Sequence, residues 1–292
     1  GLVLLLFTDA SRTDIGILRH ARARPTRLLS IGMLLTLVLG AVAAWAVFPG
    51  ISWFEAGILS AILAPTDAGL GQIIVTSQRV PMKIRQALNV EAGLNDGLSV
   101  PFLLFFMAMA TTGRANLGRF MVEQLGYGVL VGIVVGWGGG ILVGRAKRSN
   151  WMAESSTQLA LVAIPLLGAV ASEAVGASMF IAAFVAGLFV QRGFKNAGRH
   201  SVEFTDQWGQ TLNLSVFFLF GMLVARDWRG FAPRHFVYAF LSLTVVRMLP
   251  VAIALIGTRL SRATLLFMGW FGPRGLASIV LGLVFLEQKI HL

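Results

Sequence analysis

Two carboxylates, Glu91 and Asp96, lie in the stretch 89–101, NVEAGLNDGLSVP, inside a segment that is otherwise apolar enough to cross a bilayer. A charged group near the centre of a membrane helix costs about 2.5 to 3.5 kcal/mol on insertion scales, so such groups usually face a cavity and mark an ion path. At about 100° per residue, Glu91 shares a helix face with Asn95 and points roughly 140° away from Asp96. We therefore expect Asp96 to face an ion cavity and Glu91 to have a different neighbour.

Two arginines, Arg247 in VVRMLPV and Arg274 in GPRG, also lie inside apolar segments and need partners. Arg247 is the candidate partner of Glu91 in a buried ion pair. The alternative for Glu91 is a position near the membrane surface, because Arg85 precedes it by only six residues.

The composition places these charges in a membrane protein. Apolar residues make up 56% of the chain and charged residues 13%, and the mean hydropathy is +0.78. A soluble domain of this length does not have such a composition. The chain has no cysteine, which excludes thiol chemistry and cysteine-based metal sites. Its net charge of +11 lies mostly between the apolar runs, so we expect a lipid bilayer as its partner and no nucleic acid.

Ten apolar segments of helical length are predicted, and together they indicate an all-α polytopic protein with a single membrane domain over 1–292. They are 1–11, 28–48, 51–76, 84–110, 117–144, 156–173, 176–191, 208–225, 234–257 and 262–286. Most of the Lys and Arg residues then fall in loops on one side, as expected for the cytoplasmic side. The chain starts without Met, inside an apolar run, and is expected to lack its N-terminal helices.

Two of these segments are expected to be broken in mid-span. The third contains Pro65, Thr66 and Asp67, and the tenth contains Gly272 to Gly275. Proline removes a backbone donor, and broken backbone inside a membrane is tolerated only where it is buried in protein or lines a cavity. The two segments are seven crossings apart and so run in opposite directions, as an inverted repeat requires. Asp67 would offset the positive helix ends at such a crossing and Arg274 the negative ones. The alternative is a proline-kinked helix with charges that snorkel to the interface.

The motifs AILAPTDA, NVEAGLNDG, VRMLPV and GPRG, in this order, resemble the sodium/proton exchanger branch of the monovalent cation:proton antiporters. The resemblance covers essentially the whole chain. It implies an inverted-repeat antiporter fold with two crossing broken helices and a homodimer as the complete protein. This chain would hold the third to twelfth helices and lack helices at both ends.

The resemblance also implies roles for individual residues. Asp96 would bind the cation and the proton in turn, and the adjacent Asn95 would mark electroneutral exchange. Thr66 and Asp67 would complete the cation ligands at the first break. Ala92 stands where the family often has Ser, so a hydroxyl ligand is missing unless water or Ser99 replaces it.

Three further charges have implied roles outside this ligand set. Glu91 and Arg247 would form a structural ion pair, and Arg274 would be the arginine of the second break. Asp9, in LLFTDAS, resembles an acidic residue near the ion; from the sequence alone it could equally be interfacial.

These observations favour a transporter and not an enzyme. We expect it to exchange Na+, or alternatively K+ or Li+, for H+ by alternating access, with no cofactor other than the transported ions. The plasma membrane of a prokaryote is the expected location. Two alternatives stay open: an intramembrane aspartyl protease in which Asp67 and Asp96 share a proton, and a non-transporting, truncated antiporter-like protein.

Overall fold

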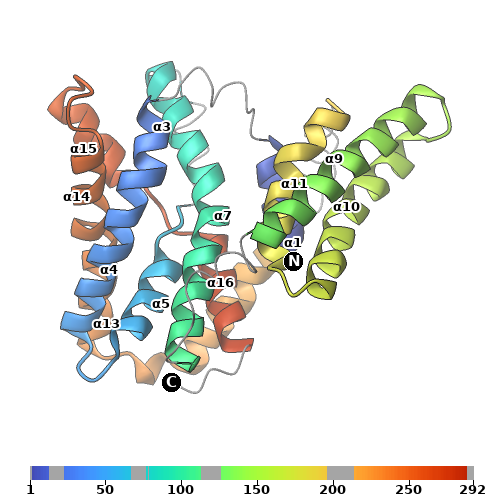
Figure 1. Cartoon of the computed structure of the whole chain (residues 1–292). Helices are drawn as coiled ribbons and strands as arrows, with labels where there is room; N and C mark the ends of the chain where they lie inside the picture. The colour runs from blue at the N-terminus through green and yellow to red at the C-terminus, as the bar shows by residue number, and fades with distance from the viewer. Residues whose placement is uncertain are drawn as a thin grey trace. The chain divides into compact units, whose positions relative to one another are not determined.

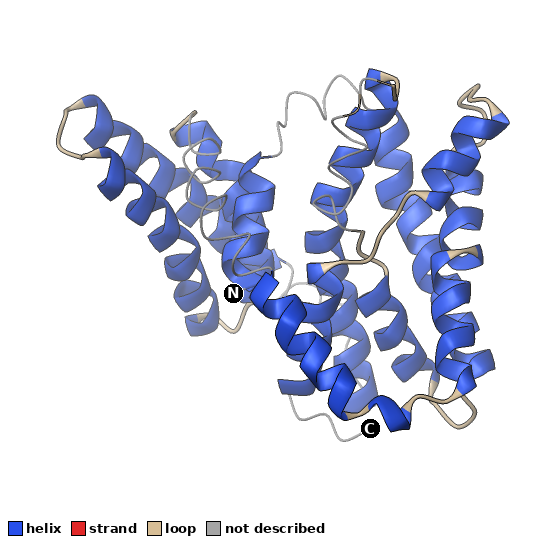
Figure 2. Cartoon of the chain, turned by 180° about the vertical axis from the view of Figure 1, so that it is seen from behind, coloured by secondary structure: helices blue, strands red, loops and turns tan. Residues whose placement is uncertain are grey.

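The computed structural model describes residues 2–12, 23–66, 77, 79–112, 126–195 and 214–287. Every regular element in these ranges is a helix, as predicted (Figure 2). Among the described residues, five helical stretches are long and apolar enough to span a membrane, the last of them with the single non-helical residue Thr244 inside it: Arg24–Val47, Met82–Thr111, Tyr127–Arg148, Ser155–Ala174 and Pro233–Ala254. Four shorter apolar helices accompany them. Parts of the predicted segments lie outside the described ranges, so their number of ten stays a prediction.

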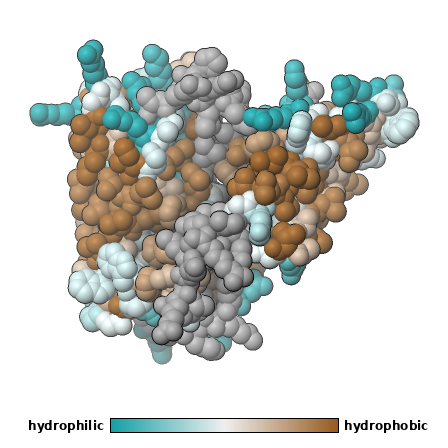
Figure 3. All heavy atoms as spheres, in the orientation of Figure 1, coloured by the Kyte–Doolittle hydropathy of each residue, from teal (hydrophilic) through white to brown (hydrophobic). Residues whose placement is uncertain are grey.

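The helices follow one another along the chain as Figure 1 labels them. They are α1 (Leu2–Arg12), α3 (Ala23–Arg27), a π-helix (Leu28–Gly32), α4 (Met33–Val47), α5 (Trp53–Leu63), α7 (Met82–Thr112), α9 (Tyr127–Arg148), α10 (Glu154–Ala174), α11 (Met179–Gly193), the helix Leu214–Arg226, a 3-10 turn (Trp228–Gly230), α13 (Pro233–Leu243), α14 (Val245–Ala254), α15 (Arg262–Trp270) and α16 (Leu276–Glu287). Hydrophobic side chains cover the flanks of the helices, and hydrophilic ones gather at helix ends (Figure 3). That distribution suits helices that cross a bilayer.

The chain divides into two compact units. The first consists of Gly1–Ile15 and Ala115–Ser215, and the second of Gly16–Arg114 and Val216–Leu292. Among the candidate site residues, Asp9 belongs to the first unit and all the others belong to the second.

Close packing between α9 and α11 holds the first unit together. Five glycines spaced four residues apart on α9 lie against the backbone of α11 and its N-cap Ser178 in the same order along both helices, so the two helices run parallel: Gly128, Gly132, Gly136, Gly140 and Gly144. A Cβ at Gly136 would lie 2.4 Å from the carbonyl oxygen of Ala186. Side chains at these positions would push the helices apart, so the glycines of α9 form a packing surface.

In the second unit, α4 packs against α5, α13 and α14. The Ser60 hydroxyl donates to the carbonyl of Leu37 at 2.8 Å, and the Tyr238 hydroxyl donates to the carbonyl of Gly40 at 3.3 Å. Hydrogen bonds therefore attach α5 and α13 to the backbone of α4. α7 packs on α5, and α16 packs on both.

Both predicted helix breaks have counterparts in this unit. α5 ends at Leu63, and Pro65 and Thr66 are not helical; the rest of that segment, from residue 67 to 76, lies outside the described ranges. α15 ends at Trp270 and α16 starts at Leu276, so the connection 271–275 is not helical, as predicted.

The predicted segment 234–257 corresponds to the span Pro233–Ala254, but one residue inside it, Thr244, is not helical. Thr244 has φ −108° and ψ −89°, which separates α13 from α14. No glycine or proline stands at this position. The helix-breaking residues that mark the other two interruptions are therefore missing here.

Candidate functional site

α7 presents four buried polar side chains within nine residues. Glu91 and Asn95 are each 4% exposed, Asp96 is 8% exposed and Ser99 is fully buried. Glu91 and Asn95 both contact groups around the two helix breaks. They therefore share a face of α7, as the helical angle predicts. Such a concentration of buried polar groups in an apolar helix requires partners from other elements.

Arg247 and Glu91 form the ion pair expected from the sequence. The Nη1 atom of Arg247 lies 2.5 Å from Oε1 of Glu91, and Nη2 lies 3.0 Å from Oε2. The two side chains are 6% and 5% exposed. This bidentate geometry is the strong form of a charge-assisted contact. Glu91 is therefore a buried group paired across helices and not a surface carboxylate.

Asn95 connects α7 to the first helix break. Its Nδ2 donates to the Thr66 hydroxyl at 2.6 Å, while its Oδ1 accepts no hydrogen bond from the part of the chain that the structure describes. Ser99 donates to the backbone carbonyl of Asn95 at 2.7 Å. The Asn95 side chain thus keeps a buried acceptor oxygen next to Asp96 and Thr66.

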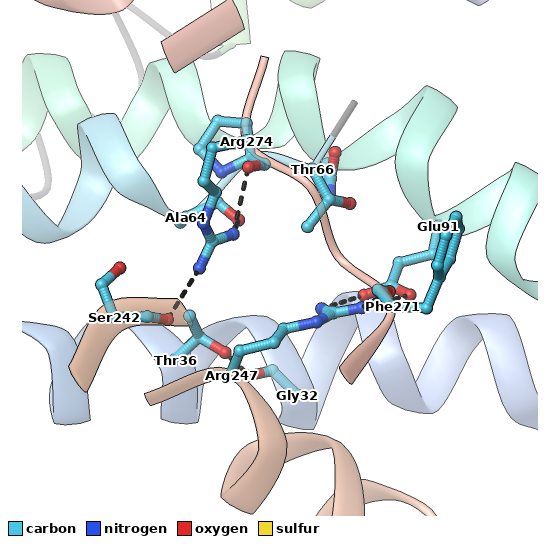
Figure 4. A network of polar contacts seen from close by, with 11 residues as sticks. Gly32, Thr36, Ala64, Thr66, Glu91, Ser242, Arg247, Phe271 and Arg274 are labelled. Atoms are coloured by element: carbon cyan, nitrogen blue, oxygen red, sulfur yellow. Dashed lines mark hydrogen bonds and ion pairs between the residues drawn. The ribbon is translucent and has the colours of Figure 1, made fainter. Parts of the chain in front are cut away.

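The second break lies against both the first break and the ion pair. A Cβ at Gly272 would lie 2.7 Å from Nε of Arg247 and 3.2 Å from Cγ2 of Thr66. Only glycine allows the backbone to come this close. The carbonyl of Phe271 also accepts from Nη2 of Arg247, at 3.5 Å (Figure 4).

Arg274 neutralises backbone carbonyls at helix ends. Its Nη1 donates to the carbonyls of Ala64 at 2.8 Å and Pro65 at 3.1 Å, which follow the last turn of α5. This is the charge compensation at a negative helix end that the sequence predicts for Arg274. Its Nη2 donates to the carbonyl of Ser242 at 3.3 Å (Figure 4).

Two of the predicted site residues cannot be placed in this arrangement. Asp67 lies outside the described residues, and Asp9 lies on α1 with its side chain outside them. The structure therefore brings Thr66 into contact with Asn95, the residue before Asp96 on α7. The positions of the Asp67 and Asp9 side chains stay predictions.

Some polar groups of the region were not anticipated. The carbonyl of Ser242 gives no signal in the sequence, since any residue carries one. Ser278, on α16, is buried, and its hydroxyl has no partner within the described ranges. Its place three residues after Gly275 is the signal that would have identified it.

Oxygen atoms of an amide, a hydroxyl and a carboxylate next to broken backbone suit a hard monovalent cation. No group of three or more His, Cys, Asp or Glu side chains that could hold a metal ion occurs among the residues searched, namely the described ones.

The sequence pattern of the family described as sodium/hydrogen exchanger, transmembrane, matches residues 1–291. The chain belongs to this family.

Two curated relatives illustrate the similarity. The uncharacterized Na(+)/H(+) exchanger YjcE of Escherichia coli is 35% identical over 199 residues, which cover 64% of this chain and 35% of that protein. A Na(+)/H(+) antiporter of Schizosaccharomyces pombe is 28% identical over 261 residues, which cover 81% of this chain and 54% of that protein.

A third relative is named for K+ and not for Na+. The K(+)/H(+) antiporter NhaP2 of a Shewanella species is 25% identical over 290 residues, which cover 96% of this chain and 49% of that protein. The chain thus spans between about a third and about half of the length of these relatives.

The solved structure of the sodium proton antiporter MjNhaP1 from Methanocaldococcus jannaschii has the same fold, with a TM-score of 0.78. The match covers 98% of this chain and 74% of that one, at 19% identity. The predicted antiporter fold class is thereby confirmed.

Proposed function

We propose that this membrane protein exchanges a monovalent cation for protons, and that Asp96 is the carboxylate for which the two ions compete. The observation that carries the proposal is the buried set of Asp96, Asn95 and Thr66 at an interrupted helix, in a chain of the sodium/hydrogen exchanger family. One carboxylate cannot hold a cation and a proton together, so binding of one ion releases the other. Exposure of the site to each side of the membrane in turn then couples their opposite movements.

The finer parts of the proposal rest on chemistry and on relatives. With Asn95 neutral beside it, Asp96 carries one cation in one direction and one proton in the other, which makes the exchange electroneutral. Na+ is the first candidate, and K+ remains a candidate because relatives are named for either ion. Asp67 and Asp9 are proposed as further carboxylates that face the cation. The complete protein is proposed to be a homodimer in a prokaryotic plasma membrane.

The decisive experiment measures proton movement in proteoliposomes that contain a trapped pH indicator and an imposed pH gradient. Addition of Na+ or K+ should dissipate the gradient for the unmodified protein. Asp96→Asn should be at least about tenfold slower, since an amide neither takes up the proton nor supplies the charge. Asp227→Asn is the matched control, because Asp227 is exposed in a loop between helices and should leave the rate unchanged.

Each other outcome rejects part of the proposal. Full activity of Asp96→Asn would show that another group carries the ions. A folded but silent unmodified protein, tested with Na+, K+ and Li+, would favour the non-transporting alternative. The protease alternative pairs Asp96 with Asp67, and cleavage of a membrane-embedded peptide that is lost in Asp96→Asn would support it instead.

A further inference from the structure

The interruption at Thr244 coincides with a hydrogen bond from its side chain to the backbone of the preceding turn. Both the N–H of Thr244, at 3.1 Å, and its hydroxyl, at 2.6 Å, donate to the carbonyl of Phe240. Back-bonding of this kind bends helices and weakens the next hydrogen bonds of the ladder. Pro250 lies within α14 and by itself would free the carbonyl of Val246, four residues earlier, and not one before Thr244.

Arg274 occupies the place that the interruption opens. In an unbroken helix the carbonyl of Ser242 would accept from the N–H of Val246. Here Nη2 of Arg274 donates to that carbonyl, while Nη1 of the same guanidinium donates to the carbonyls of Ala64 and Pro65 (Figure 4). The cation therefore lies between the C-terminal ends of α5 and α13, where two partial negative charges favour it.

The helices on the two sides of Thr244 have different attachments. On α13, Tyr238 donates to the carbonyl of Gly40 on α4. On α14, Arg247 lies in the first turn and makes the bidentate contact with Glu91. Both helices also pack on α4, and the break at Thr244 changes the direction of α14, which carries Arg247 to Glu91.

We propose that Arg274 is a positioning residue that holds the break at Thr244 open and thereby sets the direction of Arg247 toward Glu91. The guanidinium ties together three helix interruptions: its own, the end of α5 and the break between α13 and α14. The proposal concerns the geometry of the ion pair. Only its consequence for transport rests on the proposed function.

The test is a double-mutant cycle in which the unfolding equilibrium constant is measured for Arg274→Lys and Glu91→Gln, singly and together. Lysine keeps the positive charge, and so its electrostatic effect on the pair, but lacks the planar fork that reaches three carbonyls. If Arg274 positions Arg247, the Glu91→Gln change should alter the equilibrium constant at least about fivefold less in the Arg274→Lys background than in the unmodified protein. Equal effects within about twofold would overturn the proposal and leave Arg274 as a cap of α5 alone.

A second variant leaves Arg274 in place and covers the case in which Arg274→Lys does not fold. Thr244→Ala removes the back-bond and favours a continuous helix, so it should weaken the effect of Glu91→Gln in the same direction. An unchanged effect there would also overturn the proposal. These measurements need no transport, so a silent protein would reject the proposed function and leave this inference to be decided by the cycle.

Discussion

Replacing Glu91 by glutamine removes one charge from a pair whose side chains are 6% and 5% exposed and joined by two hydrogen bonds. The change leaves the guanidinium of Arg247 buried without a counter-charge. Breaking a buried pair in this way costs about 3 to 5 kcal/mol, against about 0 to 1 kcal/mol for an exposed pair. Glutamine still accepts one hydrogen bond, so we expect a loss near the lower end, about 3 kcal/mol. Arg247→Met strands the carboxylate instead and should cost about 4 kcal/mol.

The double variant Glu91→Gln/Arg247→Met shows whether the stability losses of the two single variants come from a broken interaction between the charges or from two independent effects. With both charges removed, neither partner is left buried without its counter-charge, and the protein should be within about 2 kcal/mol of the unmodified one. Reversible unfolding in detergent can be followed by the fluorescence of the seven tryptophans. Asp227→Asn, in an exposed loop, should change stability by less than about 0.5 kcal/mol.

Two results would refute this reasoning. A loss below about 1 kcal/mol for each single change would mean that water reaches the pair in the folded protein. A double variant as unstable as the sum of the two single changes would mean that the charges do not interact and that the losses come from packing.

Three other changes follow from the contacts around the site and in α9. Thr66→Val leaves the buried Asn95 amide without its acceptor and should cost about 1 to 3 kcal/mol in unfolding free energy, whereas Thr66→Ser should cost far less; equal losses would rule out the hydrogen bond as the cause. Gly272→Ala should cost about 1 to 3 kcal/mol and slow cation-dependent proton movement, because its Cβ would overlap the adjacent guanidinium; unchanged stability and rate would contradict that close approach. Gly136→Ala should separate α9 from α11 and lower the melting temperature, while Gly138→Ala, with nothing within 4 Å of its Cβ, should leave it unchanged or raise it slightly; equal melting temperatures would argue against the tight packing.

The charges that could be paired from the sequence share a simple property. Glu91 and Arg247 stood out because charged groups are costly in apolar segments and few are present, so the number of possible partners was small. The breaks at Pro65 and Gly272–Gly275 were visible because proline and glycine act on their own backbone. Asp67, which was selected at the first break, and Asp9, which was selected by the family resemblance, stay predictions.

Other contacts could not be inferred because their cause is remote in sequence. The hydrogen bond of Asn95 to Thr66 joins residues 29 apart, and its existence depends on where the end of α5 meets α7. The break at Thr244 has no glycine or proline to announce it. Helical periodicity is the same on both sides of Thr244, so the pattern alone favours a single helix.

The sequence by itself determined that this is an all-helical membrane protein of the exchanger family, with carboxylates and arginines in its spans and two helices broken by their own residues. The family follows from the resemblance of four motifs, and the other properties follow from composition and local backbone chemistry, which each segment carries with it. The tertiary structure alone decided that Arg274 reaches Ser242 as well as Ala64, that Gly272 lies against Arg247, and that a third interruption separates α13 from α14. Such contacts depend on distances between segments far apart in the chain, and only the packing of the helices fixes those distances.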